Sequence, residues 1–328
     1  LPASFFNRTH VFSIGPMFST ESSHSSSQVS RSRNSTSGKS TTNPSSSPLC
    51  FSSVPVNSWV IGDVHGCHNT LLRLIHRIEE QEAQPYLVFI GDLVGKGPDS
   101  LGVLEYLMSQ PDHVSILLGN HDLHLLACSY GIAEPRPSDR TESILKLSDL
   151  HGWRSWLQSQ DLILEIPHGS HRHRLVHAGT APYWNEQELI QRTSESLALI
   201  RSNDWSWYKN KASEEWETVS ILTRIRCVHR SSQKPEFEFT GAPDDAPEEL
   251  CPWFKALSPD GQKATDASKP NEPHYIFGHW ARLGLSMGEK ATCIDSGCVY
   301  GGDLTAYQPS TGLILQVPHD ESSSRQNS

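Results

Sequence analysis

The chain has 328 residues, of which 36% are hydrophobic and 20% are charged, and its formal net charge is −10. No window approaches the roughly 18 consecutive apolar residues that a membrane span needs, and the acidic charge argues against a DNA-binding surface but suits a protein that holds cations. The seven cysteines are scattered and form no CxxC pair, which argues against a disulfide framework and a cysteine-based zinc module, and favours a soluble protein in a reducing intracellular compartment.

The first part of the chain, residues 1–53, differs in composition from the rest. Residues 1–50 contain 16 Ser, four basic residues and one acidic residue, a net charge of +3, whereas the remainder carries 23 basic and 36 acidic residues, a net charge of −13. So little apolar surface cannot offset the entropy of ordering, and we expect a disordered leader. Its composition also fits a mitochondrial or plastid transit peptide. A retained tail of a cytoplasmic protein, or upstream sequence translated in error, is an equal alternative.

The organised part is predicted to cover residues 54–318, with a loop-rich insertion at about 231–273 and a polar, frayed tail at 319–328. Five short apolar runs in it are each followed at once by a polar cluster. They are 59–61 before GDVHG, 86–90 before GDLVGKG, 114–118 before GNHD, 175–176 before HAG, and 275–277 before GHW. Each run suits a buried strand, and the leucine and isoleucine spacing predicts helices at 67–80 and 99–108. The clusters then lie at the carboxyl ends of strands, where open α/β sheets bind ligands.

The polar clusters carry six side chains with metal-binding chemistry, namely Asp63, His65, Asp92, Asn120, His177 and His279. Carboxylates, imidazoles and an amide suit Mn, Fe, Co or Zn. Six ligands are about right for two ions that share a bridging carboxylate, an arrangement that activates a water for phosphoryl displacement. Each residue alone has a plain structural explanation, so the prediction rests on their joint occurrence. Other histidines, His124 among them, lack this context and are expected on the surface or in the core.

The ordered set GDVHG, GDLVGKG, GNHD, VHAG and FGHW resembles the calcineurin-like metallophosphoesterases, and more narrowly the symmetrical bis(5′-nucleosyl)-tetraphosphatases. Longer stretches such as LTRIRC and IDSGCVYGGDLTAY extend the resemblance from about residue 58 to 318. The resemblance implies an α/β fold in which two β-sheets pack face to face with helices outside, an α/β/β/α sandwich. It assigns the bridging position to Asp92, one ion to Asp63 and His65, and the second ion to Asn120, His177 and His279.

One block departs from the related protein Ser/Thr phosphatases, which read GDxxDRG where this chain has Gly95 and Lys96. This departure counts against a protein phosphatase. The resemblance makes His121 the general acid that protonates the leaving oxygen, but the aspartate that would orient it is absent, and the adjacent Asp122 is the candidate replacement. A Gly-Lys block also recurs in eukaryotic relatives of the tetraphosphatases, some of which act on RNA caps.

The reaction implied by the resemblance is symmetrical cleavage of diadenosine tetraphosphate to two ADP by a hydroxide activated on two divalent ions. Mn²⁺ or Co²⁺ is expected, with Fe or Zn as alternatives. A dinucleoside polyphosphate is the expected partner, and an RNA 5′-cap hydrolase on the same scaffold is the alternative. A non-catalytic binding module is disfavoured because all six ligands and His121 are present. The sequence leaves the oligomeric state open.

An anionic substrate needs local cations on an acidic chain, and Lys96, Arg224 and Arg226 are the candidates. The two arginines alternate with one isoleucine in LTRIR, which predicts that they face one side of a strand. Adenine needs an aromatic stacking surface. Trp184 is the first candidate, and the others are Tyr183, Trp253 and Phe254, although packing in the core explains each of them equally well.

Overall fold

The computed structural model describes residues 50–169, 171–257 and 272–322. Most of the predicted leader, residues 1–49, lies outside the described residues, as does the part of the predicted insertion from 258 to 271. In the described part, no helix is both long and apolar enough to pass through a membrane.

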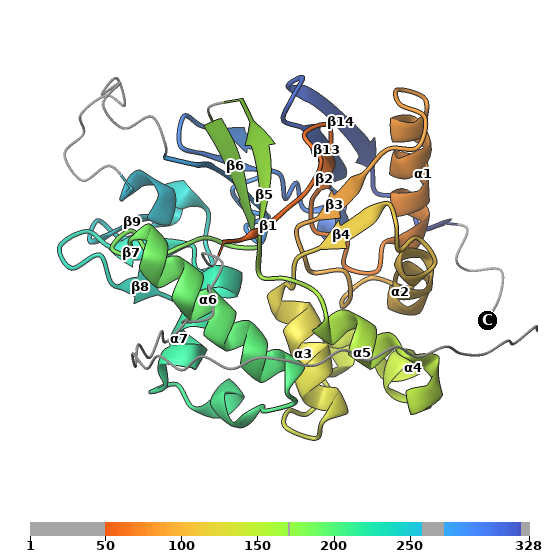
Figure 1. The fold of residues 1–328 in the computed structure, drawn as a ribbon, viewed down its shortest axis with the longest axis horizontal. Helices are drawn as coiled ribbons and strands as arrows, with labels where there is room; N and C mark the ends of the chain where they lie inside the picture. The colour runs from red at the N-terminus through yellow and green to blue at the C-terminus, as the bar shows by residue number, and fades with distance from the viewer. Residues whose placement is uncertain (1–49, 170, 258–271, 323–328) are drawn as a thin grey trace, which may run out of the picture. The chain divides into compact units, whose positions relative to one another are not determined.

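Two β-sheets form the framework of the described part (Figure 1). The five-stranded sheet has the order β14 (Leu313–Pro318), β13 (Asp303–Gln308), β2 (Trp59–Ile61), β3 (Leu87–Phe89) and β4 (Val114–Ile116). The six-stranded sheet has the order β1 (Ser52–Ser53), β5 (Ile163–His168), β6 (His171–Val176), β10 (His274–Phe277), β12 (Ala291–Cys293) and β11 (Ser286–Met287). Strands β2, β3 and β4 are parallel, and so are β6, β10 and β12. Each set therefore brings its carboxyl ends to one edge of its sheet.

The alternation of side chains along β2 and β3 explains how the two sheets pack. Val60 and Val88 are fully buried and join Leu175 of the six-stranded sheet in one apolar cluster. Their neighbours Trp59 and Phe89 belong instead to the larger cluster beneath the helices. Because successive residues of a strand face opposite sides, each of these short strands is apolar on both faces.

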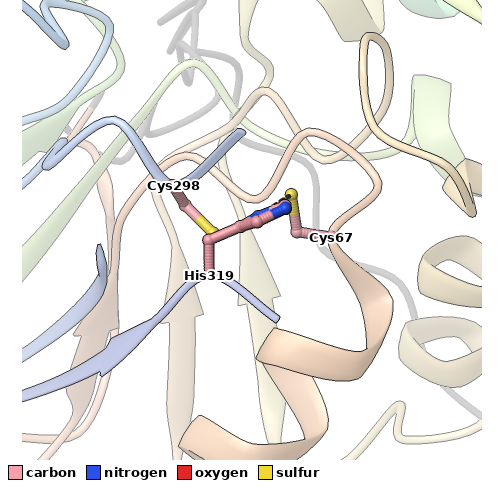
Figure 2. Close-up of side chains that lie close together, drawn as sticks. All are labelled: Cys67, Cys298 and His319. Carbon is pink, nitrogen blue, oxygen red and sulfur yellow. Dashed lines mark hydrogen bonds between the residues drawn. The ribbon is translucent and has the colours of Figure 1, made fainter. Parts of the chain in front are cut away.

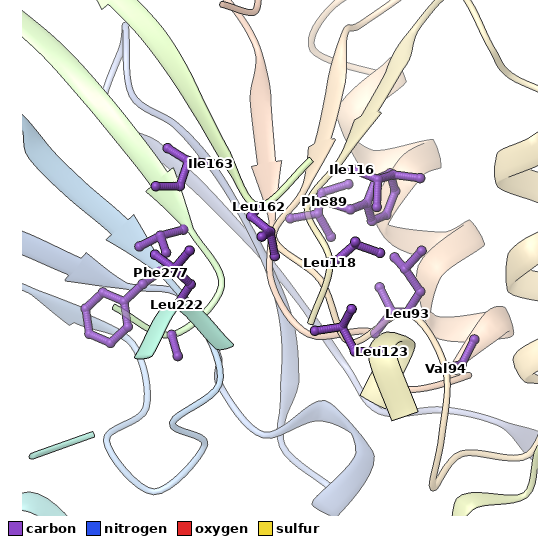
Figure 3. Packing of buried hydrophobic residues seen from close by; sticks show 14 of the residues in the cluster. Phe89, Leu93, Val94, Ile116, Leu118, Leu123, Leu162, Ile163, Leu222 and Phe277 are labelled. Atoms are coloured by element: carbon purple, nitrogen blue, oxygen red, sulfur yellow. The ribbon is translucent and has the colours of Figure 1, made fainter. Parts of the chain in front are cut away.

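Seven helices of the described part complete the fold, with α1 beside the five-stranded sheet (Figure 1). They are α1 (His68–Glu79), α2 (Ser100–Met108), α3 (Asn120–Ser129), α4 (Glu142–Leu145), α5 (Trp153–Gln158), α6 (Glu186–Arg201) and α7 (Glu214–Arg224). Figure 3 shows the buried side chains of the larger cluster, with Phe89 and Ile116 on one side and Ile163 and Phe277 on the other. Two packed sheets flanked by helices confirm the predicted fold class.

The elements predicted from the apolar runs are also present. The runs at 59–61, 86–90 and 114–118 contain β2, β3 and β4, the run at 275–277 lies within β10, and 175–176 ends the longer β6. The helices expected at 67–80 and 99–108 are α1 and α2.

Two regions are more ordered than the sequence suggested. The predicted insertion contributes β8 (Pro235–Glu236) and β9 (Leu250–Pro252) to a third, three-stranded sheet with β7 (Cys227–His229). At the other end, residues 319–322 are tied to α1 rather than frayed. Glu321 accepts hydrogen bonds from the backbone amides of Asn69 (3.2 Å) and Thr70 (3.0 Å), which satisfies free donors at the start of the helix. Residues 323–328 of the predicted tail lie outside the described residues.

Candidate active site

The six predicted metal ligands converge from the carboxyl ends of both sheets. In the five-stranded sheet Asp63 follows β2, Asp92 follows β3 and Asn120 opens α3 just after β4, whereas His177 and His279 follow β6 and β10 of the other sheet. The ligands therefore lie where the two sets of parallel strands end.

Asp92 lies between histidines from the two sheets. Its Oδ2 atom is 3.5 Å from His65 Nε2 and 3.5 Å from His177 Nε2. Donor atoms of Asp92, His177 and His279 lie within 4.8 Å of one another, and so do those of His65, Asp92 and His121. A carboxylate shared by two such groups has the position that a bridging ligand between two ions requires.

Two buried atoms support metal binding directly. Within the described residues, Asn120 Oδ1 and His177 Nε2 are buried without a hydrogen-bond partner, although leaving a buried polar atom unsatisfied is costly. The second nitrogen of His177 lies 2.7 Å from Ile90 O, and His65 Nδ1 lies 3.2 Å from Val94 O. Carbonyl contacts of this kind fix the ring so that the other nitrogen can bind a metal. The residues present therefore fit a dinuclear metal centre.

The electrostatics of the cluster are those of an anionic site enclosed by protein. Burial, together with Asp295, raises the pKa of Asp63 well above its usual value. Burial would also lower the pKa of His177, but the Asp92 and Asp63 carboxylates outweigh it and raise that pKa to about 9. Divalent cations would relieve the repulsion between these carboxylates and stabilise their charged forms.

The backbone at the site is held in an uncommon conformation. His65, Asp92, Lys96 and His279 all have positive φ angles, of 50°, 51°, 64° and 63°, a region that residues other than glycine rarely occupy. Such strain collects at functional sites because the surrounding fold imposes it. A Cβ atom at Gly119 would collide with Asp92 Oδ1, so the ligand can approach only a glycine there.

His121 lies at the edge of this cluster. Its amide donates to Asp92 Oδ1 at 2.8 Å, and its ring centroid is 4.8 Å from that of His65. Burial, with Lys96 and Arg136 nearby, lowers the pKa of His121 to about 4 even though Asp92 acts in the opposite direction. Gly95 stands where the protein phosphatase motif has its aspartate. A Cβ atom there would lie 2.8 Å from His121 Nδ1, so any side chain at this position would press against the His121 ring.

Asp122 does not take over the role of that aspartate, and this prediction is wrong. Its carboxylate is buried and accepts from the backbone amides of Leu93 (3.0 Å), Val94 (3.4 Å) and Gly119 (2.9 Å). Because these amides belong to the loop after β3 and to the start of α3, Asp122 holds the segments that carry the ligands together and does not orient His121.

Two hollows meet at the ligand cluster. One, of about 1170 Å³, runs along α3 and α7, and the other, of about 720 Å³, reaches the loop after β12. Both are lined by Lys96, Asn120, His121, Arg226, His279 and Tyr300. The site therefore opens into two hollows that share these six residues, and the two hollows together are called the cleft below.

The three predicted phosphate-binding cations all line this cleft. The strand expected for Arg224 and Arg226 is wrong, because Arg224 is the last residue of α7 and Arg226 lies in the connection to β7. Because α7 ends beside the larger hollow, the side chains of Arg224 and Arg226 still border it. Arg226 Nη2 donates to His279 O at 3.3 Å, and Lys96 Nζ lies 3.4 Å from His65 Nε2.

None of the four predicted stacking residues borders the two hollows, although Tyr183 is 45% exposed and borders a third hollow. Trp253 is 0% exposed and packs with Phe254 in the core. Trp184 does not line either of the two hollows. The Arg192 guanidinium lies over the Trp184 ring at 5.4 Å. Different aromatic residues line the larger hollow, namely Tyr208, Trp216, Phe237 and Tyr300. The sequence carries no separate signal for these four residues, because their chain segments lack the apolar-run pattern.

Two further polar residues of the site were missed. Asp295 is buried, borders the smaller hollow, and follows β12 and Ile294 in the way that the six predicted ligands follow their strands, so the same pattern could have found it. His124 lines the larger hollow and was assigned no role. Its Nε2 lies 3.1 Å from Asp139 Oδ2 and its Nδ1 lies 3.1 Å from the Tyr208 hydroxyl.

Comparison with known proteins agrees with this geometry. The family model for the calcineurin-like phosphoesterases matches residues 57–283, and the chain belongs to that family. Its members use a dinuclear metal centre, and the histidine and aspartate groups described above supply residues able to hold one.

Within this family the chain belongs with the symmetrical bis(5′-nucleosyl)-tetraphosphatases. It is 33% identical over 278 residues to the protein of that name from Janthinobacterium sp. (strain Marseille), covering 80% of this chain and 96% of the relative. It is also 33% identical to the one from Methylococcus capsulatus, covering 76% and 90%. The crystal structure of a candidate diadenosine tetraphosphatase superposes with a TM-score of 0.56 at 24% identity, covering 83% and 98%, which supports the fold.

Proposed function

We propose that this chain hydrolyses diadenosine tetraphosphate symmetrically to two ADP. The observation that carries the proposal is the pair of hollows that share Asn120, His121 and His279 of the ligand cluster. A symmetrical dinucleotide cleaved at its centre needs room for a nucleotide on both sides of the reacting phosphorus, and the two hollows provide about 1170 and 720 Å³. The symmetrical tetraphosphatases to which the chain is 33% identical support the same substrate.

The residues that would hold two divalent ions are Asp63, His65, Asp92, Asn120, His177 and His279. Manganese or cobalt suits this set of oxygen and nitrogen donors, with iron or zinc as alternatives. Bound ions would lower the pKa of an attacking water and offset the charge of the phosphates. Asp92 would serve both ions, and the backbone contacts to His65 and His177 would keep their rings in the binding orientation.

Cations in the cleft would bind the phosphates despite the acidic charge of the whole chain. The larger hollow is lined by seven basic and two acidic side chains: Lys96, Arg136, Arg140, Lys209, Lys211, Arg224 and Arg226 against Asp139 and Glu238. A locally positive cleft attracts an anionic substrate even on an acidic protein. Lys96 and Arg226 border both hollows, so they would contact the phosphates nearest the bond that breaks.

His121 would donate the proton to the leaving ADP. Its pKa of about 4 in the substrate-free site leaves the ring neutral near pH 7. Polyphosphate bound beside it would raise this pKa, because a nearby anion stabilises the imidazolium. Substrate binding would therefore favour the protonated ring that the leaving group needs.

An RNA 5′-cap is the second candidate substrate. A third hollow of about 660 Å³ shares Lys211, Trp216 and Phe237 with the larger one. A longer chain of nucleotides could continue along these side chains, whereas diadenosine tetraphosphate would end in the first hollow.

Product analysis tests the proposal. The purified chain with Mn²⁺ or Co²⁺ is incubated with diadenosine tetraphosphate, and the nucleotides are separated. ADP as the sole product is expected. AMP plus ATP would show that the substrate binds in another register, and hydrolysis of capped RNA alone would replace the substrate while keeping the metal site.

A further inference from the structure

Cys67, Cys298 and His319 form a second cluster of metal-binding side chains (Figure 2). Cys67 immediately precedes α1, Cys298 opens the short 3₁₀ turn Cys298–Tyr300, and His319 follows β14. The two sulfurs and one imidazole nitrogen lie within 4.8 Å of one another, and Figure 2 shows the three side chains pointing into the same space. Both cysteines are buried, at 0% and 2% exposed, whereas His319 reaches solvent.

The spacing of the donor atoms fits a tetrahedral ion. With Zn–S at about 2.3 Å and Zn–N at about 2.0–2.1 Å, a tetrahedral site separates a sulfur from a nitrogen by about 3.5–3.6 Å. Cys67 Sγ and His319 Nδ1 are 3.8 Å apart. Two thiolates and a neutral imidazole also make an uncharged complex with a divalent zinc ion, which suits the buried position of both sulfurs.

The surrounding contacts leave these side chains available. Glu321, and not Cys67, caps the first amides of α1. The Cys67 amide donates to Val64 O at 3.0 Å, and the His319 amide donates to Gly302 O at 3.0 Å. The backbone thus fixes two of the three residues while their side chains meet.

We propose that Cys67, Cys298 and His319 bind one zinc ion, with water in the fourth position. Two thiolates and an imidazole favour zinc, and three protein ligands with one water are a coordination that zinc adopts in proteins. The ion would join three segments distant in sequence: the loop that carries His65, the loop that begins at Asp295, and the first residues after β14. Scattered spacing hides such a site in the sequence. The proposal does not depend on the substrate proposed above.

Cobalt substitution tests the zinc site separately from the phosphoesterase centre. The full chain is stripped of metal under reducing conditions and titrated with Co²⁺. Thiolate-to-cobalt charge transfer absorbs in the near ultraviolet, and the six phosphoesterase ligands include no sulfur, so that centre cannot produce the band. We expect the band in the unmodified chain and its loss in the double variant Cys67→Ser/Cys298→Ser.

A matched control is the double variant Cys227→Ser/Cys251→Ser, which removes two buried cysteines on the paired strands β7 and β9. It should keep the band. The zinc content of chain purified without chelator should fall by one ion in the first variant and not in the control.

Three results would overturn the proposal. The first is a chain with free thiols and no charge-transfer band, and the second is equal loss of the band in the control. The third is a mass lower by two hydrogens with both thiols unreactive, which would show a Cys67–Cys298 disulfide instead. If the first double variant does not fold, His319→Ala provides the test, because loss of one ligand must shift or weaken the band.

Discussion

Replacing Arg226 with alanine tests whether the cleft recognises phosphate. Arg226 borders both hollows and donates to the backbone carbonyl of His279. Burial lowers the pKa of its guanidinium, although Asp295 and Asp92 act in the opposite direction. A half-buried cation in a cleft is screened less than a surface one, so its contact with a phosphate should be strong.

The expected magnitude follows from the kind of contact. A hydrogen bond to a charged group contributes about 1.5–3 kcal/mol, and each 1.36 kcal/mol changes a rate tenfold. We therefore expect Arg226→Ala to lower kcat/KM for diadenosine tetraphosphate by about 10- to 150-fold. We expect the kcat/KM of Arg226→Lys to lie between the values of the unmodified chain and Arg226→Ala, since lysine keeps the charge but loses the planar pair of donors.

The assay is the initial rate of ADP formation over a range of substrate concentrations, with circular dichroism to confirm folding. Arg201→Ala is the matched control. Arg201 ends α6 and forms a surface ion pair with Asp161 at 2.8 Å, so its loss should leave kcat/KM within twofold. An unchanged kcat/KM in Arg226→Ala, or an equal fall in both variants, would refute the role of Arg226 in phosphate binding.

Four further predictions follow from the structure. His279→Ala should abolish turnover and lower the metal content with little change in circular dichroism, and full activity would contradict its role as a ligand. Stacking of Trp216 on a base contributes about 1–3 kcal/mol, so Trp216→Ala should raise KM by about 5- to 150-fold, whereas Trp184→Ala should not change KM. Equal changes in KM in the two variants would contradict a stacking role specific to Trp216. Glu321→Ala should lower the free energy of unfolding by about 1 kcal/mol, measured by urea denaturation, because the α1 cap is lost. An unchanged urea midpoint would show that this cap does not stabilise the fold. Burial and the neighbouring histidines lower the pKa of His173 from 6.5 to about 4. Between pH 6.5 and about pH 4, His173 is therefore protonated in the unfolded chain and neutral in the folded chain. Stability should fall across that window, less steeply in His173→Gln, and parallel urea midpoints would show that His173 does not cause the fall.

The sequence predicted the ligand positions because each ligand directly follows an apolar strand. Asp63 and Asp92 can be placed near one another from that pattern and the parallel order of β2 and β3, whereas His177 follows a strand of the other sheet, so that only the family resemblance placed it beside Asp92. The role of Asp122 could not be predicted in this way, since its partners are amides of another loop, and a hydrogen bond to backbone leaves no mark on residue identity. Trp184 failed for a related reason: an aromatic residue looks the same in a sequence whether it packs on Arg192 or faces a ligand.

The left-handed backbone at His65, Asp92, Lys96 and His279 has a consequence for the evolution of the protein. Each such position costs about 1–3 kcal/mol that the rest of the fold must supply. Glycine would relieve the cost at each of them, because it has no Cβ and tolerates positive φ. Selection for thermal stability alone should therefore favour loss of these very side chains. In a library screened first for heat resistance and only later for turnover, we expect replacements at these four positions among the surviving inactive clones.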